Sequence, residues 1–234
     1  KKIFSNPSNF TNKFIDIMKS LETLFIGLKE LYEHNIGHND IKADNIVVDG
    51  GFCKYIDFGY SFKYSNNAYY KKRSSLEFLT DRIYPPYPYE FIYLYAPLDL
   101  LEDEKEDMDS EIYRSLHSRY KDVHSTIFKR DINMDLSSLI YRHIDGLKNK
   151  ETIKPANRTK LLSLLDTYSL GMIIPYTLYS IAKHHKSEKK FIKLLKLPKI
   201  KPFMNLFKQM TETNYFNRIN PVDLYAQYLG LMDL

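Results

Sequence analysis

A short segment, residues 36–62, concentrates polar side chains that could handle a metal-bound phosphate. It contains two carboxylates, Asp40 and Asp57, together with the amide of Asn45 and the ammonium of Lys42. Mg²⁺ prefers hard oxygen ligands and takes few of them from protein, and it is often shared with substrate phosphates. These residue types therefore indicate the chemistry of a metal-bridged phosphate, provided that the fold brings them to one point.

A predicted β-hairpin would bring these polar side chains together. Val47 and Val48 form an apolar run, Asp49-Gly50-Gly51 has the composition of a tight turn, and residues 52–56 alternate as a second strand. Because a hairpin holds its two ends close together, we expect the polar residues before it to meet Asp57 after it.

The motifs on either side of this hairpin resemble those of a known enzyme family. The run HNDIKADN at 38–45, followed by DFG at 57–59, is similar to the catalytic loop H-R-D-L-x-x-x-N and the metal-binding D-F-G of eukaryotic-type protein kinases. The resemblance implies that Asp40 is the catalytic base and that Lys42 lies near the transferred phosphate of ATP. It also implies that Asn45 and Asp57 bind the Mg²⁺ ions that bridge the ATP phosphates.

The same resemblance gives structural roles to the neighbours. His38 and Phe58 are expected to pack the loop against the core, and Gly59 completes the second motif. Asn39 stands where the family has Arg, which pairs with a phosphorylated residue in the activation segment. Since Asn cannot form such charge-assisted bonds, we expect no activation by phosphorylation through this position.

Three later residues resemble the parts of the family that support the catalytic loop. Glu90, in Pro-Tyr-Glu, is similar to the end of A-P-E, and Asp166, in DTYSLG, is similar to D-x-W-S-x-G. Arg218 is similar to the Arg of R-x-T-x-x-E-L. The resemblance implies that Asp166 accepts hydrogen bonds from the backbone of the catalytic loop and that Arg218 forms a buried ion pair with Glu90. A carboxylate stranded in an apolar helix would be costly to bury without such bonds.

Apolar periodicity predicts the helices that carry these motifs. A long helix is expected over residues 12–34, capped by Thr11 or Asn12 and ended by Asn35 or Gly37. A helix at about 161–179 has almost no polar face and should be buried on all sides, with Pro175 bending or breaking it. Helices at 183–234 begin with a stretch that contains eight lysines, which we interpret as a solvated helix surface; binding of acidic lipid or nucleic acid is the alternative.

The predicted organisation is a single protein kinase C-terminal lobe over residues 1–234. The catalytic loop occupies 36–45, the activation segment 57–90 and an insertion about 91–160, because the distance from Glu90 to Asp166 is much longer than in the family. The insertion contains an acidic run at 102–107. We interpret this run as a solvated loop; a docking patch for basic substrates is the alternative.

Composition limits the partners. With 44% hydrophobic residues, a net charge of +5 and a single cysteine, the chain is an ordinary globular protein of a reducing compartment. The charge is too small to predict nucleic-acid binding, and no apolar run is long enough for a membrane span. The cytoplasm is expected, which for a viral protein means the host cytoplasm or the virion. The abundance of Lys, Asn, Ile and Tyr is typical of AT-rich genomes, such as those of some parasites and large DNA viruses.

The fold class expected is mainly α with a small β-hairpin. No Gly-rich loop or V-A-I-K strand precedes His38, so the N-terminal lobe of the family is absent from this chain, and a first residue other than Met favours a fragment. The resemblance implies an ATP- and Mg²⁺-dependent kinase that acts on protein Ser or Thr hydroxyls, with the missing lobe as a partner. The alternatives are a pseudokinase-type interaction module and a small-molecule phosphotransferase of the choline or aminoglycoside kinase type.

Overall fold

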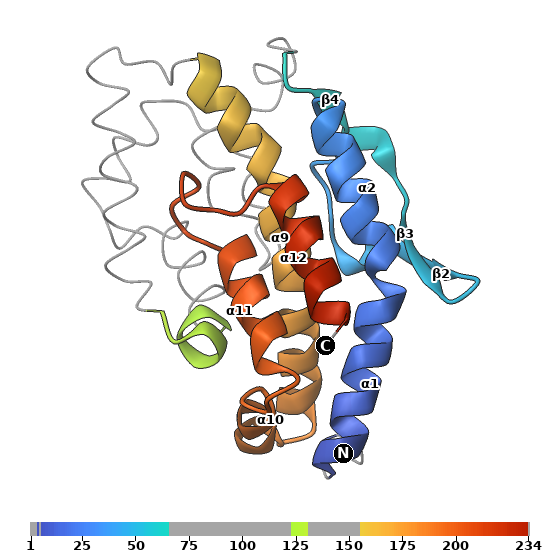
Figure 1. Ribbon diagram of the computed structural model, residues 1–234, viewed down its shortest axis with the longest axis vertical. Helices are drawn as coiled ribbons and strands as arrows, with labels where there is room; N and C mark the ends of the chain where they lie inside the picture. Colours follow the sequence, from blue (N-terminus) through green and yellow to red (C-terminus); the bar gives the residue numbers. More distant parts are fainter. Residues whose placement is uncertain (1–3, 5, 66–122, 131–154, 234) are drawn as a thin grey trace.

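The computed structural model describes residues 4, 6–65, 123–130 and 155–233, with only the backbone at 155–158. Everything said below about the structure concerns these residues (Figure 1). They are mostly helical, with two small antiparallel sheets, which is the fold class expected and is compatible with a kinase-like fold. The α-helices are α1 (Pro7–Ser20), α2 (Glu22–Glu33), α9 (Pro155–His184), α10 (Glu188–Leu194), α11 (Lys201–Met210) and α12 (Pro221–Met232). The strands are β1 (Ile36–Gly37), β2 (Ile46–Asp49), β3 (Phe52–Tyr55) and β4 (Phe62–Lys63).

The N-terminal helical region differs from the prediction of one helix over 12–34. It consists of α1 and α2, which meet at Leu21, and α1 starts five residues earlier than predicted, at Pro7. The cap is Asn6, whose Oδ1 accepts hydrogen bonds from the backbone N–H groups of Ser8 and Asn9 at 2.9 and 3.2 Å. The prediction of Thr11 or Asn12 as the cap is therefore wrong: an Asn–Pro pair is a stronger start signal than apolar spacing alone. Asn35, with φ 56°, follows the end of α2 as predicted.

The core forms where the apolar faces of α1 and α2 meet the later helices. Phe14 packs edge-on against Phe203 of α11, and Phe25 stacks on Tyr228 of α12 with ring centroids 4.3 Å apart. The phenol of Tyr228 also donates a hydrogen bond to the carbonyl of Met18 at 2.7 Å. In Figure 1, α1 and α2 run along one side of α9 and α12, which joins the two ends of the chain in one core.

Helix α9 is longer than predicted and continues through Pro175. The expectation that Pro175 could break the helix is wrong. Residues Leu161 to Ile173 are buried, and their packing outweighs a proline cost of about 3 kcal/mol. Contrary to the expectation that no apolar run is long enough, the described residues Thr159–His184 pass a length and composition test for a membrane span. However, 83% of the most apolar window of this helix is buried inside the protein, as in the core helix of a globular protein.

The predicted hairpin is present as β2 and β3. The register pairs Ile46 with Tyr55 and Asp49 with Phe52, and the turn residues Gly50 and Gly51 have φ values of 59° and 84°. Two consecutive positive φ angles characterise the type I′ turn that matches the twist of a hairpin, and glycine adopts them without strain. A second short ladder pairs β1 with β4, so the two ends of the segment 36–63 lie side by side.

The lysine-rich stretch does not form one helix. It covers the end of α9, the short α10 and the connection to α11. All eight of its lysines are exposed, whereas Phe191, Leu194 and Ile200 are buried. Of the predicted insertion, residues 123–130 and the first residues of α9 are described; they include a π-helical turn, His124–Phe128. The acidic run 102–107 lies outside the described residues.

Candidate active site

The loop that contains Asp40 is held from behind by Asp166 of α9. The carboxylate oxygens of Asp166 accept hydrogen bonds from the backbone N–H groups of His38 at 2.6 Å and Asn39 at 2.8 Å. Burial raises the pKa of Asp166, and the two N–H donors oppose this rise because they stabilise the anion. Asn39 has φ 64°, a left-handed conformation that Asn tolerates better than most residues.

Asp40, Lys42 and Asn45 contact one another directly. Oδ2 of Asp40 accepts a hydrogen bond from Nδ2 of Asn45 at 2.8 Å and lies 3.0 Å from Nζ of Lys42. Nδ2 of Asn45 also donates to the backbone carbonyl of Asp40 at 2.9 Å. The 3₁₀ turn Ala43–Asn45 bends the chain back so that a residue five positions later can reach Asp40. Asp40 is only 1% exposed, while the Lys42 side chain is 30% exposed.

Asp57 joins this group through the backbone of Ile56. The N–H of Ile56 donates to the carbonyl of Asn45 at 3.0 Å, which places Asn45 and Asp57 at the same end of the hairpin. Asp57 is exposed and has a left-handed backbone, φ 60° and ψ 70°, and its Oδ1 accepts from the N–H of Gly59 at 3.3 Å. Three of the four polar residues thus contact one another, and the bond of Ile56 places the fourth, Asp57, at the same end of the hairpin.

His38 lies behind the loop and contacts the residues that precede Asp57. Its Nε2 is 3.2 Å from the carbonyl of Ile56, an acceptor, so Nε2 bears the proton. The ring is buried between Tyr55 and Phe58, with ring centroids 5.4 and 4.7 Å away. Phe58 is itself 49% exposed. The Phe58 ring is tilted against that of His38, and the side chain is thus only partly packed against the core.

Arg218 lies in the loop before α12. Its guanidinium donates to the carbonyls of Leu164 at 3.0 Å and of Glu212 at 2.8 and 3.0 Å, and its Cζ lies 5.0 Å from the ring centroid of Tyr168. The expected partner, Glu90, lies outside the described residues, so the predicted ion pair stays a prediction. Arg218 does bind α9 close to Asp166.

Sequence reasoning missed two buried residues from the insertion, His124 and Arg130. Arg130 donates to the backbone carbonyls of Lys208 and Thr211 and forms a 2.8 Å ion pair with Glu212. His124 Nε2 lies 2.9 Å from the phenol oxygen of Tyr168. Burial, helped by the charges of Arg130 and Arg218, lowers the pKa of His124 to about 3, so this ring is neutral at physiological pH. No local spacing marks either residue, because their partners lie tens of positions away.

The donor set at the end of the hairpin fits Mg²⁺ better than a softer metal. Nδ2 of Asn45 is used by Asp40, so its Oδ1 is the atom left for a metal, and the exposed carboxylate of Asp57 is the other hard oxygen donor. The described part of the chain contains no group of three or more His, Cys, Asp or Glu side chains that could hold a metal. Two protein ligands suit an ion that receives its other ligands from phosphate and water.

Comparison with known proteins gives one match. Residues 2–85 match the family model described as the protein kinase domain. Neither the curated proteins nor the solved structures gave a match. The matched segment contains the first two helices, the loop with Asp40, the hairpin and Asp57, which are the elements that build the site above. The match covers less than half of the 234 residues, and together with this geometry it supports a protein-kinase-like protein.

Proposed function

We propose that this chain contains the catalytic region of an ATP-dependent serine/threonine protein kinase. The observation that carries the proposal is the environment of Asp40: a buried carboxylate, in contact with Lys42 and Asn45, on a loop whose backbone is fixed by Asp166. A carboxylate oriented by its neighbours on a rigid support suits a group that accepts a proton in a defined geometry.

In the proposed reaction, Asp40 orients the acceptor hydroxyl and accepts its proton. The hydroxyl oxygen of the protein substrate forms a bond to the γ-phosphorus of ATP, the bond from that phosphorus to the bridging oxygen breaks, and ADP leaves. Mg²⁺, when bound, would offset the negative charge of the phosphates. Asn45 and Asp57 are the residues that would hold the metal.

Lys42 is proposed to change partners during this reaction. Its ammonium is 3.0 Å from Asp40 in the structure and its side chain is partly exposed. A turn toward the transferred phosphate would uncover Asp40 for the hydroxyl and place a positive charge where negative charge develops. A lysine two positions after the catalytic Asp is also the feature that, by resemblance, favours Ser and Thr over Tyr acceptors.

We further propose that a segment outside these 234 residues covers the nucleotide. Val47 and Ile56 lie on the same face of the hairpin as Asn45 by the strand register, and they are 38% and 39% exposed. An exposed apolar surface beside a phosphate site suits contact with a base and with a covering segment. The elements described before His38 are two helices and one short strand.

The test is phosphate transfer from ATP in the presence of Mg²⁺, using the chain together with any residues that its gene encodes before Lys1. Acceptors are a basic protein, an acidic casein-like protein and choline. Asp40→Asn is compared with Asp44→Asn, which alters an exposed carboxylate in the same loop. Transfer to protein that requires Asp40 supports the proposal. Transfer to choline alone would favour a small-molecule phosphotransferase, and the absence of any transfer would favour a non-catalytic interaction module.

A further inference from the structure

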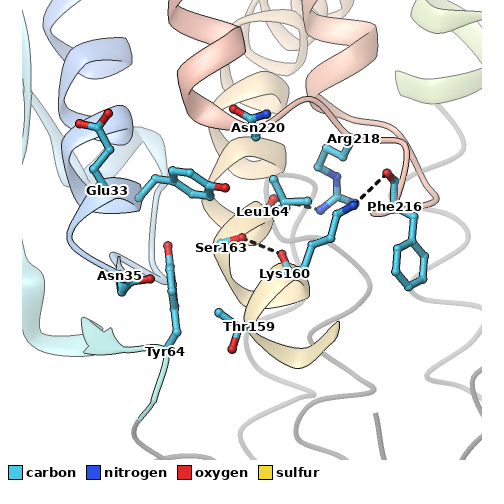
Figure 2. A pocket seen from close by; sticks show the side chains of 11 residues that line it. Glu33, Asn35, Tyr64, Thr159, Lys160, Ser163, Leu164, Phe216, Arg218 and Asn220 are labelled. Atoms are coloured by element: carbon cyan, nitrogen blue, oxygen red, sulfur yellow. Dashed lines mark hydrogen bonds between the residues drawn. The ribbon is translucent and has the colours of Figure 1, made fainter. Parts of the chain in front are cut away.

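We propose that a cavity beside the end of α2 binds a small organic anion such as a phosphate ester or a carboxylate. The cavity has a volume of about 680 Å³ and lies between the end of α2, strand β4, the first turns of α9 and the loop before α12 (Figure 2). This volume is within the range of small-molecule sites, roughly 300–1,000 Å³. None of the residues that would handle Mg²⁺ or ATP lines it, so the inference goes beyond the proposed kinase function.

The charge of the lining favours an anion. Lys160 contributes a positive charge to the lining, the guanidinium of Arg218 is already bonded to the carbonyls of Leu164 and Glu212, and Glu33 is the acidic residue. The Glu33 carboxylate is engaged elsewhere, since its Oε2 lies 2.7 Å from Nζ of Lys29. Lys160 has no carboxylate of the described residues within ion-pair distance; its ammonium lies 3.4 Å from the carbonyl of Phe216 and 5.3 Å from the centroid of that ring. A carbonyl and a ring face do not neutralise an ammonium, so an anionic ligand would gain a charge-assisted hydrogen bond.

The remaining lining is polar and suits a ligand with further oxygen atoms. The hydroxyls of Tyr32, Thr159 and Ser163 line the cavity together with the amide of Asn35. The Ser163 hydroxyl donates to the carbonyl of Lys160 at 2.8 Å, so its oxygen is held in place (Figure 2). Phe216, which is 47% exposed, adds an apolar wall on the side of Lys160. The combination fits an anionic group near Lys160 attached to a small ring or chain.

On the opposite side of the cavity, the Tyr64 side chain is held in place by hydrogen bonds within the protein. The phenol of Tyr64 donates to the carbonyl of Ile36 at 2.9 Å, and its backbone N–H donates to the carbonyl of Asn35 at 3.0 Å. The two bonds tie Tyr64 to strand β1 and to the residue directly before it. A preformed wall reduces the ordering cost of binding, which is what a site for a small ligand needs.

A single-tryptophan reporter can test the proposal, because the sequence contains no tryptophan. Phe216→Trp places the only indole at the cavity wall. Phe52→Trp is the matched control, since Phe52 is also 47% exposed but lies on the hairpin. Titration with phenyl phosphate is expected to change the fluorescence of the Phe216→Trp protein along a saturable curve and to leave that of the Phe52→Trp protein unchanged.

Reversing the charge of single lysines then tests whether the anion binds at Lys160. In the Phe216→Trp protein, Lys160→Glu is expected to raise the Kd for phenyl phosphate by about tenfold or more, and Lys190→Glu, at an exposed lysine of α10, by less than about twofold. The proposal is overturned if the cavity reporter shows no saturable change, or if Lys160→Glu and Lys190→Glu shift the Kd equally. Neither outcome depends on kinase activity, so the result is independent of the proposed function.

Discussion

The carboxylate of Asp166 accepts a hydrogen bond from the backbone N–H of His38 at 2.6 Å, although 128 positions separate the two residues in the chain. This bond and its companion to Asn39 connect the central helix α9 to the loop that contains Asp40. The shape of the loop therefore depends on α9 as much as on its own sequence.

Replacing Asp166 by Asn is expected to destabilise the protein. An amide has one oxygen, so its NH₂ group would face one of the two N–H donors and leave that buried group unsatisfied, at a cost of about 1–3 kcal/mol. Denaturant unfolding measures the loss. Asp16→Asn, at an exposed position of α1, is the control and should change stability very little. Equal unfolding midpoints for the two variants would contradict the role given to Asp166.

The lowered pKa of His124 predicts that the free energy of unfolding depends on pH. Its pKa is about 3 in the folded protein, below the ordinary 6.5, because the ring is buried next to two arginines. The unfolded chain therefore binds this proton first as the pH falls, so the free energy of unfolding should fall as the pH drops from 6.5 toward 3, by up to about 1.4 kcal/mol per pH unit.

The check is denaturant unfolding at about pH 5 and about pH 7. In the His124→Gln protein this contribution should be missing, because glutamine can bond Tyr168 but does not titrate. His34→Gln, at an exposed position, should keep the slope of the unaltered protein. The same slope in all three proteins would mean that His124 does not resist protonation.

Gly171 is expected to tolerate no larger residue. A Cβ atom at this position of α9 would lie 2.5 Å from Cβ of Met210 and 3.1 Å from Cγ2 of Thr211. Although alanine is the better helix former, overpacking of this kind costs about 1–3 kcal/mol, so Gly171→Ala should lower the free energy of unfolding.

Gly230→Ala in α12 is the matched control, because no atom lies within 4 Å of the added Cβ. This substitution should be neutral or stabilise by up to about 1 kcal/mol. A stabilised Gly171→Ala protein would show that α9 and α11 are farther apart than described.

Local chemistry explains what the sequence could predict. The hairpin was predictable because Gly50 and Gly51 set the turn within two residues, and it places Asp57 at the same end as Asn45. Asp166 was predictable because a carboxylate in an apolar helix needs buried donors. In each case the signal lies within a few positions of the residue concerned.

The remaining features depend on contacts across the chain. Arg130 has partners 78 to 82 positions away, and no periodicity marks such a residue. Proline disfavours the interior of a helix, but Pro175 lies inside α9 because the packing around that helix determines the conformation there. The early start of α1 has a different origin: Asn6 and Pro7 are a local start signal that lies outside the apolar pattern.

The central claim is that Asp40 is the catalytic base of a protein kinase. Mg²⁺-dependent transfer of phosphate from ATP to protein Ser or Thr should fall by about a hundredfold or more in the Asp40→Asn protein, the range expected for loss of a general base. The Asp44→Asn protein should retain activity within about twofold of the unaltered protein. Transfer that persists at the full rate in a folded Asp40→Asn protein would contradict the account.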